Sequence, residues 1–204
     1  MTTYSLLTEA WIPLQKLDGR SEKAGLIRAL KEAHTLLGVS DPSPLVTVAV
    51  HRLLLAMIYC IHHPIRNAND WERIWNKGCF DKGAIDAYVQ RVADRFDLLD
   101  GNRPFYQVPY MEGEKVHPCA ALLIEASSGN NPALFDHGRV EGEAALPLDR
   151  AACYLLAHQW FAIGGGVSKP FNRMDAPIAK GFVVENIGRN LFEPGFLRYE
   201  FGGS

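Results

Sequence analysis

The sequence is poor in cysteine and has no paired cysteine motif. Its four cysteines, Cys60, Cys79, Cys119 and Cys153, are widely spaced, and no two of them form a C-x-x-C pair. Structural zinc sites need close ligand pairs and small disulfide frameworks need a high cysteine density, so both are disfavoured. We therefore expect reduced thiols that are mostly buried.

The sequence also lacks an excess of charge of either sign. Lys and Arg number 21 against 23 Asp and Glu, which gives a formal net charge of -2 over 204 residues. A freestanding basic arm for nucleic acid is thereby excluded, and any contact with nucleic acid must be local. Hydrophobic residues make up 48% and charged residues 22%, which excludes a disordered chain and suffices for a sizeable core.

Long hydrophobic runs and targeting signals are missing as well. The longest apolar run, residues 53–61, is flanked by His51, Arg52 and His62 and is far shorter than the roughly 20 residues that span a bilayer. We expect this run to lie in a core helix. The first residues show no basic start, apolar stretch and cleavage site, so we expect a cytoplasmic protein without membrane contact.

Helical periodicity is the strongest pattern that is present. Apolar residues recur at helical spacing over residues 25–37 and 81–96, which we predict to be helices. Two further helices are predicted, residues 44–61 after a start signal and residues 148–162, which are apolar nearly all round and should be central. A shorter helix is predicted to end near Gly78, and weak strand patterns occur at residues 11–14 and 182–187. The predicted fold class is α+β, a mainly helical single domain with a few short strands.

Helix boundaries and one interval between helices carry further signals. Ser43 directly before Pro44 predicts an N-cap, and Asn69 three residues before Glu72 predicts a capping box. In the short helix that follows, we expect both tryptophans, Trp71 and Trp75, to be core anchors. Over residues 97–142 the periodicity fades into a long irregular loop segment, which in a compact chain is usually functional or mobile.

The first candidate binding loop covers residues 128–137. It combines small residues, amides and a single aromatic side chain, Phe135. An aromatic ring on a loop can stack on an unpaired base, and amides can bond base edges or sugars. The alternative is that Phe135 plugs the core, as isolated phenylalanines usually do.

The second candidate is a glycine turn followed by polar residues, namely Gly164, Gly165 and Gly166 and then Lys169, Asn172 and Arg173. A backbone without side chains can enter a narrow groove or approach a phosphate, and nearby cations neutralise phosphate charge. The spacing is not that of a nucleotide-binding P-loop. The alternative is an ordinary helix C-cap and turn.

No catalytic or metal centre is predicted. The histidines and acids that could converge lack ligand spacing: Asp136 with His137, His62 with His63, and His117. The G-x-S-x-G elbow of serine hydrolases is missing too. We therefore predict that the protein is not an enzyme and takes no cofactor or metal.

Four segments in this order resemble a known family: Leu6 to Leu14, Arg103 to Gln107, Ser128 to His137 and Phe161 to Gly166. Together they are similar to the large subunit of Cascade, the type I-E CRISPR surveillance complex. The resemblance implies that residues 1–193 are an N-terminal-type domain of that subunit and that residues 194–204 are an atypical tail. The lysine finger, glutamine wedge hairpin and helical bundle of the family lie downstream of the matched segments.

The resemblance implies a non-catalytic subunit in RNA-guided antiviral defense. Such a subunit contributes to recognition of the protospacer-adjacent motif (PAM), to target DNA binding and to docking at the 5′ handle end of the guide RNA. The implied partners are the other Cascade subunits, the guide RNA, double-stranded target DNA and the helicase-nuclease recruited to the complex. The implied docking residues for guide RNA or a neighbouring subunit are Asn130, Asn131, Phe135, Asp136 and His137.

The resemblance also implies that the turn at residues 164–166 approaches the PAM from the minor groove, with Lys169, Asn172 and Arg173 beside it. Minor-groove readout is degenerate, so tolerant recognition of several motifs is expected. Two alternatives stay open. A structural interaction module without DNA contact would leave the salt dependence of DNA binding unchanged when Lys169 and Arg173 are neutralised. An unrelated small-molecule enzyme would need an enclosed polar pocket around His117, Asp136 and His137.

Overall fold

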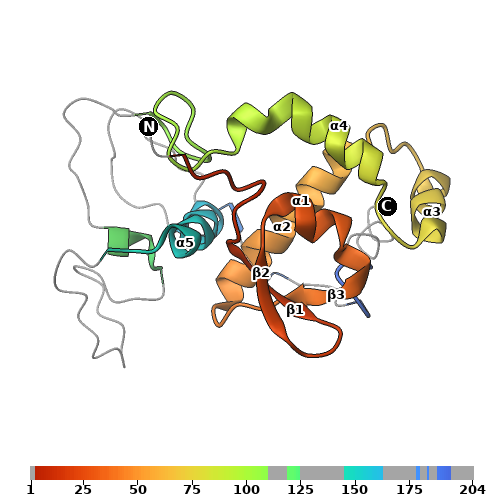
Figure 1. The fold of residues 1–204 in the computed structure, drawn as a ribbon, viewed down its shortest axis with the longest axis horizontal. Helices are drawn as coiled ribbons and strands as arrows, with labels where there is room; N and C mark the ends of the chain where they lie inside the picture. Colours follow the sequence, from red (N-terminus) through yellow and green to blue (C-terminus); the bar gives the residue numbers. More distant parts are fainter. Residues whose placement is uncertain are drawn as a thin grey trace.

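The computed structural model describes residues 3–109, 119–124, 145–162, 178–179, 183 and 188–193. This part of the chain folds into five α-helices, three 3-10 turns and one antiparallel sheet (Figure 1), which confirms the predicted mainly helical α+β class. In chain order the elements are β1 Ile12–Lys16, β2 Ser21–Ala24, α1 Leu26–Lys31, η1 Ala33–Thr35, β3 Leu36–Val39, α2 Pro44–Ile61, α3 Ala68–Lys77, α4 Lys82–Val92, η2 Ala93–Arg95, η3 Cys119–Leu122 and α5 Leu148–Phe161.

The sheet has the strand order β2-β1-β3, with β1 pairing antiparallel to both neighbours. The predicted strand at residues 11–14 corresponds to β1, whose Ile12 and Leu14 are buried on one face. The prediction of one helix over residues 25–37 is wrong, because α1 ends at Lys31 and the chain continues through η1 into β3. Leu36 and Val39 pair with β1 and are buried, so long-range pairing outweighs the local helical period.

The N-terminal turn crosses the start of α1 at very close range. α1 has no side-chain cap. The backbone N–H groups of Leu26 and Ile27 have no acceptor within the helix. They donate instead to the carbonyl oxygens of Leu6 and Leu7, each at 3.1 Å. These bonds require the two backbones to nearly touch at Gly25, where a Cβ atom would lie only 2.6 Å from the Leu7 oxygen.

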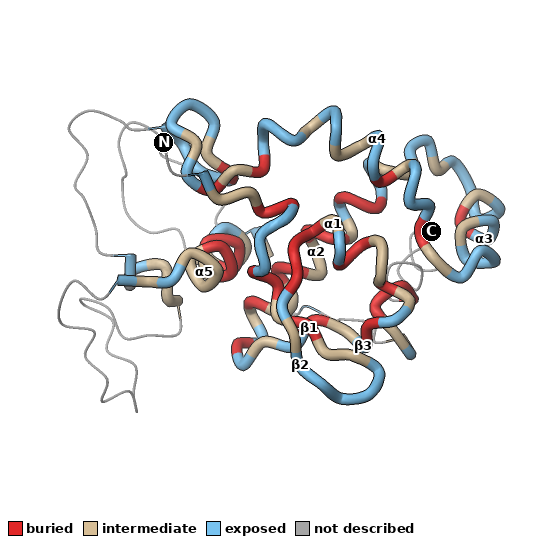
Figure 2. The backbone as a smooth tube through the Cα atoms, viewed as in Figure 1, coloured by how far each residue is buried: buried red, intermediate tan, exposed pale blue. Residues whose placement is uncertain are grey.

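The predicted start of α2 is confirmed, because the Ser43 Oγ accepts a hydrogen bond from the backbone N–H of Val46 at 3.3 Å. Among the described helices, α2 is the one whose length and apolar composition would also suit a membrane span, a property shared by core helices of soluble proteins. Several of its residues are buried inside the molecule: Val46, Ala49, Val50, Leu53, Leu54, Met57 and Ile58. The backbone of the whole fold is coloured by burial in Figure 2.

The start of α3 differs from the prediction. The N-cap is Asn67 rather than Asn69: its side chain accepts from the N–H of Asp70 at 3.1 Å, and the Asp70 carboxylate accepts from the N–H of Arg66 at 2.8 Å. The cap thus forms two residues earlier, where an acid also follows three positions after the asparagine, and this acid bonds the residue before the N-cap instead of the N-cap itself. The predicted end at Gly78 is confirmed by its left-handed φ of 68°.

Only one of the two tryptophans of α3 is a core anchor. Trp71 is buried, whereas Trp75 is 38% exposed and stacks its ring on Phe192 at a centroid distance of 6.1 Å. The helix predicted over residues 81–96 is α-helical as far as Val92 and continues as the 3-10 turn η2. The strand predicted at residues 182–187 lies outside the described residues except for Val183, which belongs to no strand.

The cysteine expectation is half right. All four thiols are free, but Cys60 and Cys119 are exposed, Cys79 is half-buried and only Cys153 is buried. Cys60 lies in the last turn of α2 and Cys119 is the first residue of η3, and neither side chain belongs to the buried core. Burial raises the pKa of the Cys153 thiol to about 12, and this cysteine lies in the middle of α5.

Candidate nucleic-acid interface

The binding residues predicted from the sequence lie outside the described residues, and their roles stay predictions. They fall in two segments, residues 125–144 with the Phe135 loop and residues 163–177 with the glycine turn. The described structure shows where these segments join the fold. One ends shortly before α5 and the other begins directly after it, so they attach at opposite ends of a 14-residue helix about 21 Å long.

α5 is the central support for both segments. It packs along α2 and against η3, and its buried side chains lie in the core: Ala152, Cys153, Leu155, Leu156 and Ala157. The predicted helix at residues 148–162 is therefore confirmed, with its last helical residue at Phe161. Any shift of α5 would move the attachment points of both segments.

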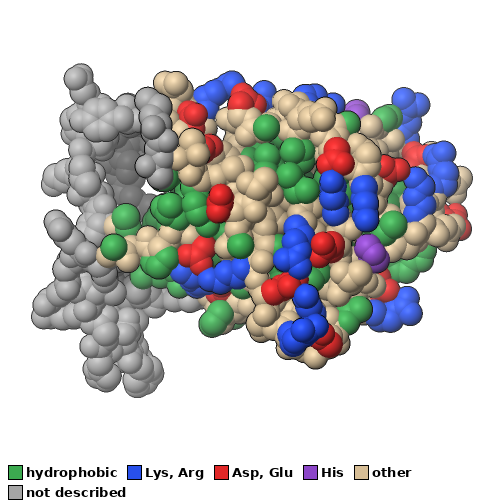
Figure 3. Space-filling model, in the orientation of Figure 1, with side chains coloured by type: hydrophobic (Ala, Val, Ile, Leu, Met, Phe, Trp, Pro, Cys, Tyr) green, Lys and Arg blue, Asp and Glu red, His purple; other side chains and the backbone are tan. Residues whose placement is uncertain are grey.

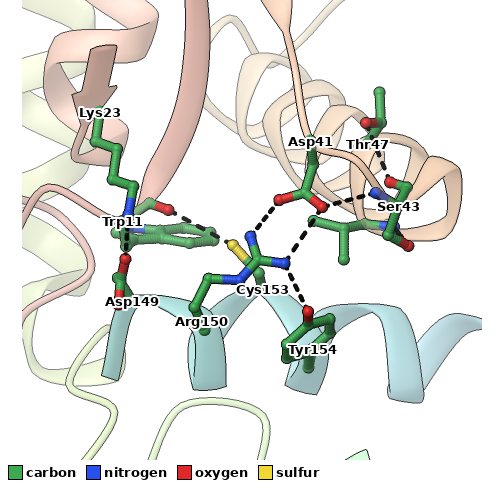
Figure 4. A network of polar contacts seen from close by, with 10 residues as sticks. Trp11, Lys23, Asp41, Ser43, Thr47, Asp149, Arg150, Cys153 and Tyr154 are labelled. Atoms are coloured by element: carbon green, nitrogen blue, oxygen red, sulfur yellow. Dashed lines mark hydrogen bonds and ion pairs between the residues drawn. The ribbon is translucent and has the colours of Figure 1, made fainter. Parts of the chain in front are cut away.

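Polar contacts fix the first half of α5 (Figure 4). Asp149 pairs with Lys23 of β2, and Arg150 pairs with Asp41, which precedes α2. The Asp41 side chain has 0% exposed surface and that of Arg150 has 25%, so this second ion pair is largely buried. The Arg150 Nη2 also donates to the Tyr154 Oη at 2.7 Å.

Electrostatics show that this network holds the helix and offers no free charge to a ligand. The hydrogen bond from Arg150 to Asp41 raises the pKa of the Arg150 guanidinium, so this side chain stays charged throughout the physiological range. The Asp41 carboxylate accepts from the Ser43 N–H at 2.9 Å as well. Each charge thus already has partners inside the protein, which is a structural arrangement and not one that activates a nucleophile.

Different contacts fix the last turn of α5, and they involve a segment far along the chain. The Trp160 carbonyl accepts a hydrogen bond from the backbone N–H of Ala179 at 3.0 Å. The Trp160 ring lies under the Arg52 guanidinium of α2, 4.8 Å from the Cζ atom to the ring centroid. The chain therefore leaves the last turn of α5 at Ala162 and is bonded to that turn again at Ala179. We call residues 163–177, which include all the predicted DNA-contacting residues, the excursion, and the contacts of Trp160 its base.

The contacts of Trp160 with Arg52 and Ala179 were not predicted from the sequence, although Arg52 itself was a visible signal. Arg52 interrupts an otherwise apolar stretch of α2, and a cation at such a position needs a partner. The partner is Trp160, which the apolar pattern of α5 assigns simply to the core. No local feature of the sequence indicates that Ala179 returns to this turn.

The charged surface over the β1–β2 hairpin and α1 is not a basic patch. On the face seen in Figure 3, Lys and Arg side chains there lie among Asp and Glu. Their ion pairs are Lys16 with Glu22, Arg20 with Asp18, and Arg28 with Glu22 and Glu32. Cations that already pair with acids within the chain contribute little to phosphate binding.

Metal ligands and small-molecule pockets do not mark another site in the described part of the chain. There, no three His, Cys, Asp or Glu side chains gather closely enough to hold a metal ion. One apolar hollow lies between η3, α5 and the start of α2, lined by residues that include Leu45, Leu122 and Tyr154. It lacks the convergent polar groups that orient a substrate.

In sequence and in fold, the chain is similar to CRISPR-associated proteins. A family model for CRISPR-associated protein Cse1 matches residues 5–197, and the chain belongs to the Cse1 family. It is 38% identical over 195 residues to CasA/Cse1 of Thermus thermophilus, which covers 93% of this chain and 38% of that relative. The chain thus spans about two fifths of the relative's length, and the resemblance inferred from the four sequence segments is confirmed.

Solved structures agree with this assignment. A structure of Thermus thermophilus CasA (Cse1) matches with a TM-score of 0.78 and 33% identity, covering 97% of this chain and 39% of that one. A chain in a CRISPR RNA-guided surveillance complex matches with a TM-score of 0.68 and 24% identity, covering 81% of this chain and 36% of that one. The second likeness is one of fold.

Proposed function

We propose that this chain is a non-catalytic subunit of an RNA-guided antiviral DNA-surveillance complex in the cytoplasm. In that role it contributes to PAM recognition, target DNA binding and docking at the 5′ handle end of the guide RNA. The observation that carries the proposal is membership of the Cse1 family over residues 5–197. The occurrence of the same fold in a CRISPR RNA-guided surveillance complex supports it.

The closed base of residues 163–177 supports the DNA-binding part of the proposal. Both ends of this excursion attach to the last turn of α5, through the chain at Ala162 and through the hydrogen bond from Ala179 to Trp160. The glycines at residues 164–166 would then approach the minor groove from a rigid base, and Lys169 and Arg173 would supply the local cations that a chain of net charge -2 needs.

Residues 125–144 supply the docking part of the proposal. They leave the fold beside η3, which packs on α5, and they rejoin it just before α5. Phe135 in this segment would contact the guide-RNA end or a neighbouring Cascade subunit. The proposed partners are the other Cascade subunits, the guide RNA, double-stranded target DNA and the recruited helicase-nuclease.

The proposed domain comprises residues 1–193. Its C-terminal part is tied to the sheet, because the Leu191 N–H donates to the Leu36 carbonyl at 2.8 Å and both Leu191 and Phe192 are buried. This bond to β3 and the burial in the same core support the proposal that the segment belongs to the same folding unit. Residues 194–204 are proposed as the tail that follows it.

Phe135→Ala is expected to weaken assembly with the other Cascade subunits and guide RNA. Truncating an aromatic anchor at an interface typically costs about 2 kcal/mol, or roughly 30-fold in affinity. The measurement is co-purification of the native chain and the variant with the tagged complex over a range of concentrations. Leu17→Ala, which truncates a 56% exposed side chain after β1, is the matched control. Equal recovery of Phe135→Ala and native chain would contradict the docking role.

Replacing Lys169 and Arg173 together with glutamine is expected to weaken DNA binding by the assembled complex and to lower its salt dependence. Each lost phosphate contact reduces the slope of log affinity against log salt by about 0.9. The measurement is target-duplex affinity between low and moderate salt. A slope equal to that of the native complex would favour the structural interaction module without DNA contact.

A further inference from the structure

Tyr106 is held in an unusual backbone conformation at the surface. Its φ of 52° is the one positive φ of a non-glycine residue in the part of the chain that the structure describes. A bulky side chain disfavours this region of backbone space, so the conformation persists only where surrounding contacts impose it. Residues in such conformations concentrate at functional positions.

Hydrogen bonds from two directions impose the conformation. The Gln107 side chain donates to the carbonyls of Leu98 at 2.9 Å and Phe105 at 3.3 Å. From α5, the Gln159 side chain donates to the Tyr106 carbonyl at 3.1 Å. The loop is therefore attached to the helix one residue before Trp160, the residue that closes the base of the 163–177 excursion.

The conformation turns the Tyr106 ring outward while its neighbour points inward. Phe105 is buried and stacks on Phe96 at a centroid distance of 5.3 Å. The Tyr106 ring meets Phe105 edge-on at 4.7 Å and 83° and stays 47% exposed. An aromatic ring that is held by one neighbouring ring, with about half of the residue open to solvent, is a suitable platform for a flat partner.

The loop that carries Tyr106 offers apolar surface and, over residues 97–109, no unpaired cation. Val108 on the same loop is 72% exposed. The one cation in residues 97–109, Arg103, pairs with Asp94 at 3.1 Å. This loop can therefore supply stacking and apolar contact, whereas charge must come from elsewhere.

We propose that Tyr106, which is bonded to the last turn of α5, stacks on an unpaired base of the target DNA. This inference rests on the proposed function, in which Lys169 and Arg173 neutralise DNA phosphates. Binding of single-stranded nucleic acid combines these two components, an aromatic ring for the base and separate cations for the backbone. The Gln159 bond places Tyr106 at the same end of α5 from which residues 163–177 emerge.

The test uses the complex assembled with guide RNA and measures its affinity for target DNA with three variants, Tyr106→Gly, Tyr106→Leu and Tyr106→Phe. Loss of one base stack should weaken DNA binding about tenfold or more in the Gly and Leu variants. The Phe variant keeps the ring and should bind within about twofold of the native complex. Glycine accepts a positive φ without strain, which offsets part of the packing lost against Phe105, so Tyr106→Gly should stay folded, and a thermal melt of each variant separates loss of contact from unfolding.

Each other outcome overturns the inference in a recognisable way. Equal DNA affinity for all three variants would exclude stacking, and the Lys169 and Arg173 double variant would still report separately on the proposed function. Native affinity for Tyr106→Leu with weak binding of Tyr106→Gly would indicate a general apolar contact. Loss of subunit recovery would assign the ring to a protein partner, and loss of guide RNA would assign it to RNA.

Discussion

Gly25→Ala is expected to destabilise the protein by about 3 kcal/mol or more, at the upper end of the cost of overpacking. The backbone angles of Gly25, φ -81° and ψ 170°, suit alanine, so the whole cost is steric. The new Cβ would lie 2.6 Å from the Leu7 oxygen and 2.9 Å from the Glu9 oxygen, and backbone atoms cannot move aside as side chains do. Relief of the clash would break the two hydrogen bonds that satisfy the start of α1.

Chemical denaturation monitored by circular dichroism measures this effect. Gly38→Ala in β3 is the matched control, because a Cβ there meets nothing within 4 Å and the backbone needs no positive φ. The control should be neutral or stabilising by up to about 1 kcal/mol, since alanine restricts the unfolded chain. A Gly25→Ala protein as stable as the control would show that the N-terminal turn does not pack as described.

Asp41→Ala is expected to lower the free energy of unfolding by about 3 kcal/mol. Removing one partner of a buried ion pair leaves the other charge uncompensated, which typically costs about 3–5 kcal/mol, and the 25% exposure of Arg150 places the effect at the lower end. The Ser43 N–H would lose an acceptor as well. The same denaturation measurement applies, extended to Arg150→Met and to the double variant.

A double-mutant cycle separates the ion pair from its surroundings. The double variant should be clearly more stable than the sum of the two single costs predicts, because neither charge is then left buried alone. Asp94→Ala is the control, since its pair with Arg103 is 61% and 64% exposed and should contribute no more than about 1 kcal/mol. Additive costs within about 0.5 kcal/mol would contradict a direct coupling between Asp41 and Arg150.

Local signals made the long helices and one cap predictable. Ser43 before Pro44 and the apolar run that follows define α2 without reference to the rest of the chain, and α5 is recognisable because it is apolar nearly all round. β3 was not predictable in this way, because Leu36 and Val39 also fit a helical period and only pairing with β1 decides between the two. The start of α3 was ambiguous because two asparagines, Asn67 and Asn69, each precede an acid by three residues.

The candidate site likewise has a part that was predictable from the sequence and a part that was not. Its loops could be identified from composition and family resemblance, since amides, glycines and cations are visible in the sequence itself. Its support could not, because it depends on pairs that lie far apart in the chain, such as Arg52 with Trp160 and Tyr106 with Gln159. A helical period identifies a buried face but does not identify the residues that face it.

The contacts that hold α5 also set an order of events during synthesis on the ribosome. Asp41 and Arg150 are 109 residues apart, and Lys23 and Asp149 are 126 apart. The apolar face of α2 is therefore synthesised long before α5, the helix that covers it. At roughly 5–20 residues per second, translation of residues 62–147 takes on the order of 4 to 17 seconds. During that interval the nascent chain exposes α2, and this helix is where chaperone capture or aggregation of the unfinished protein should begin.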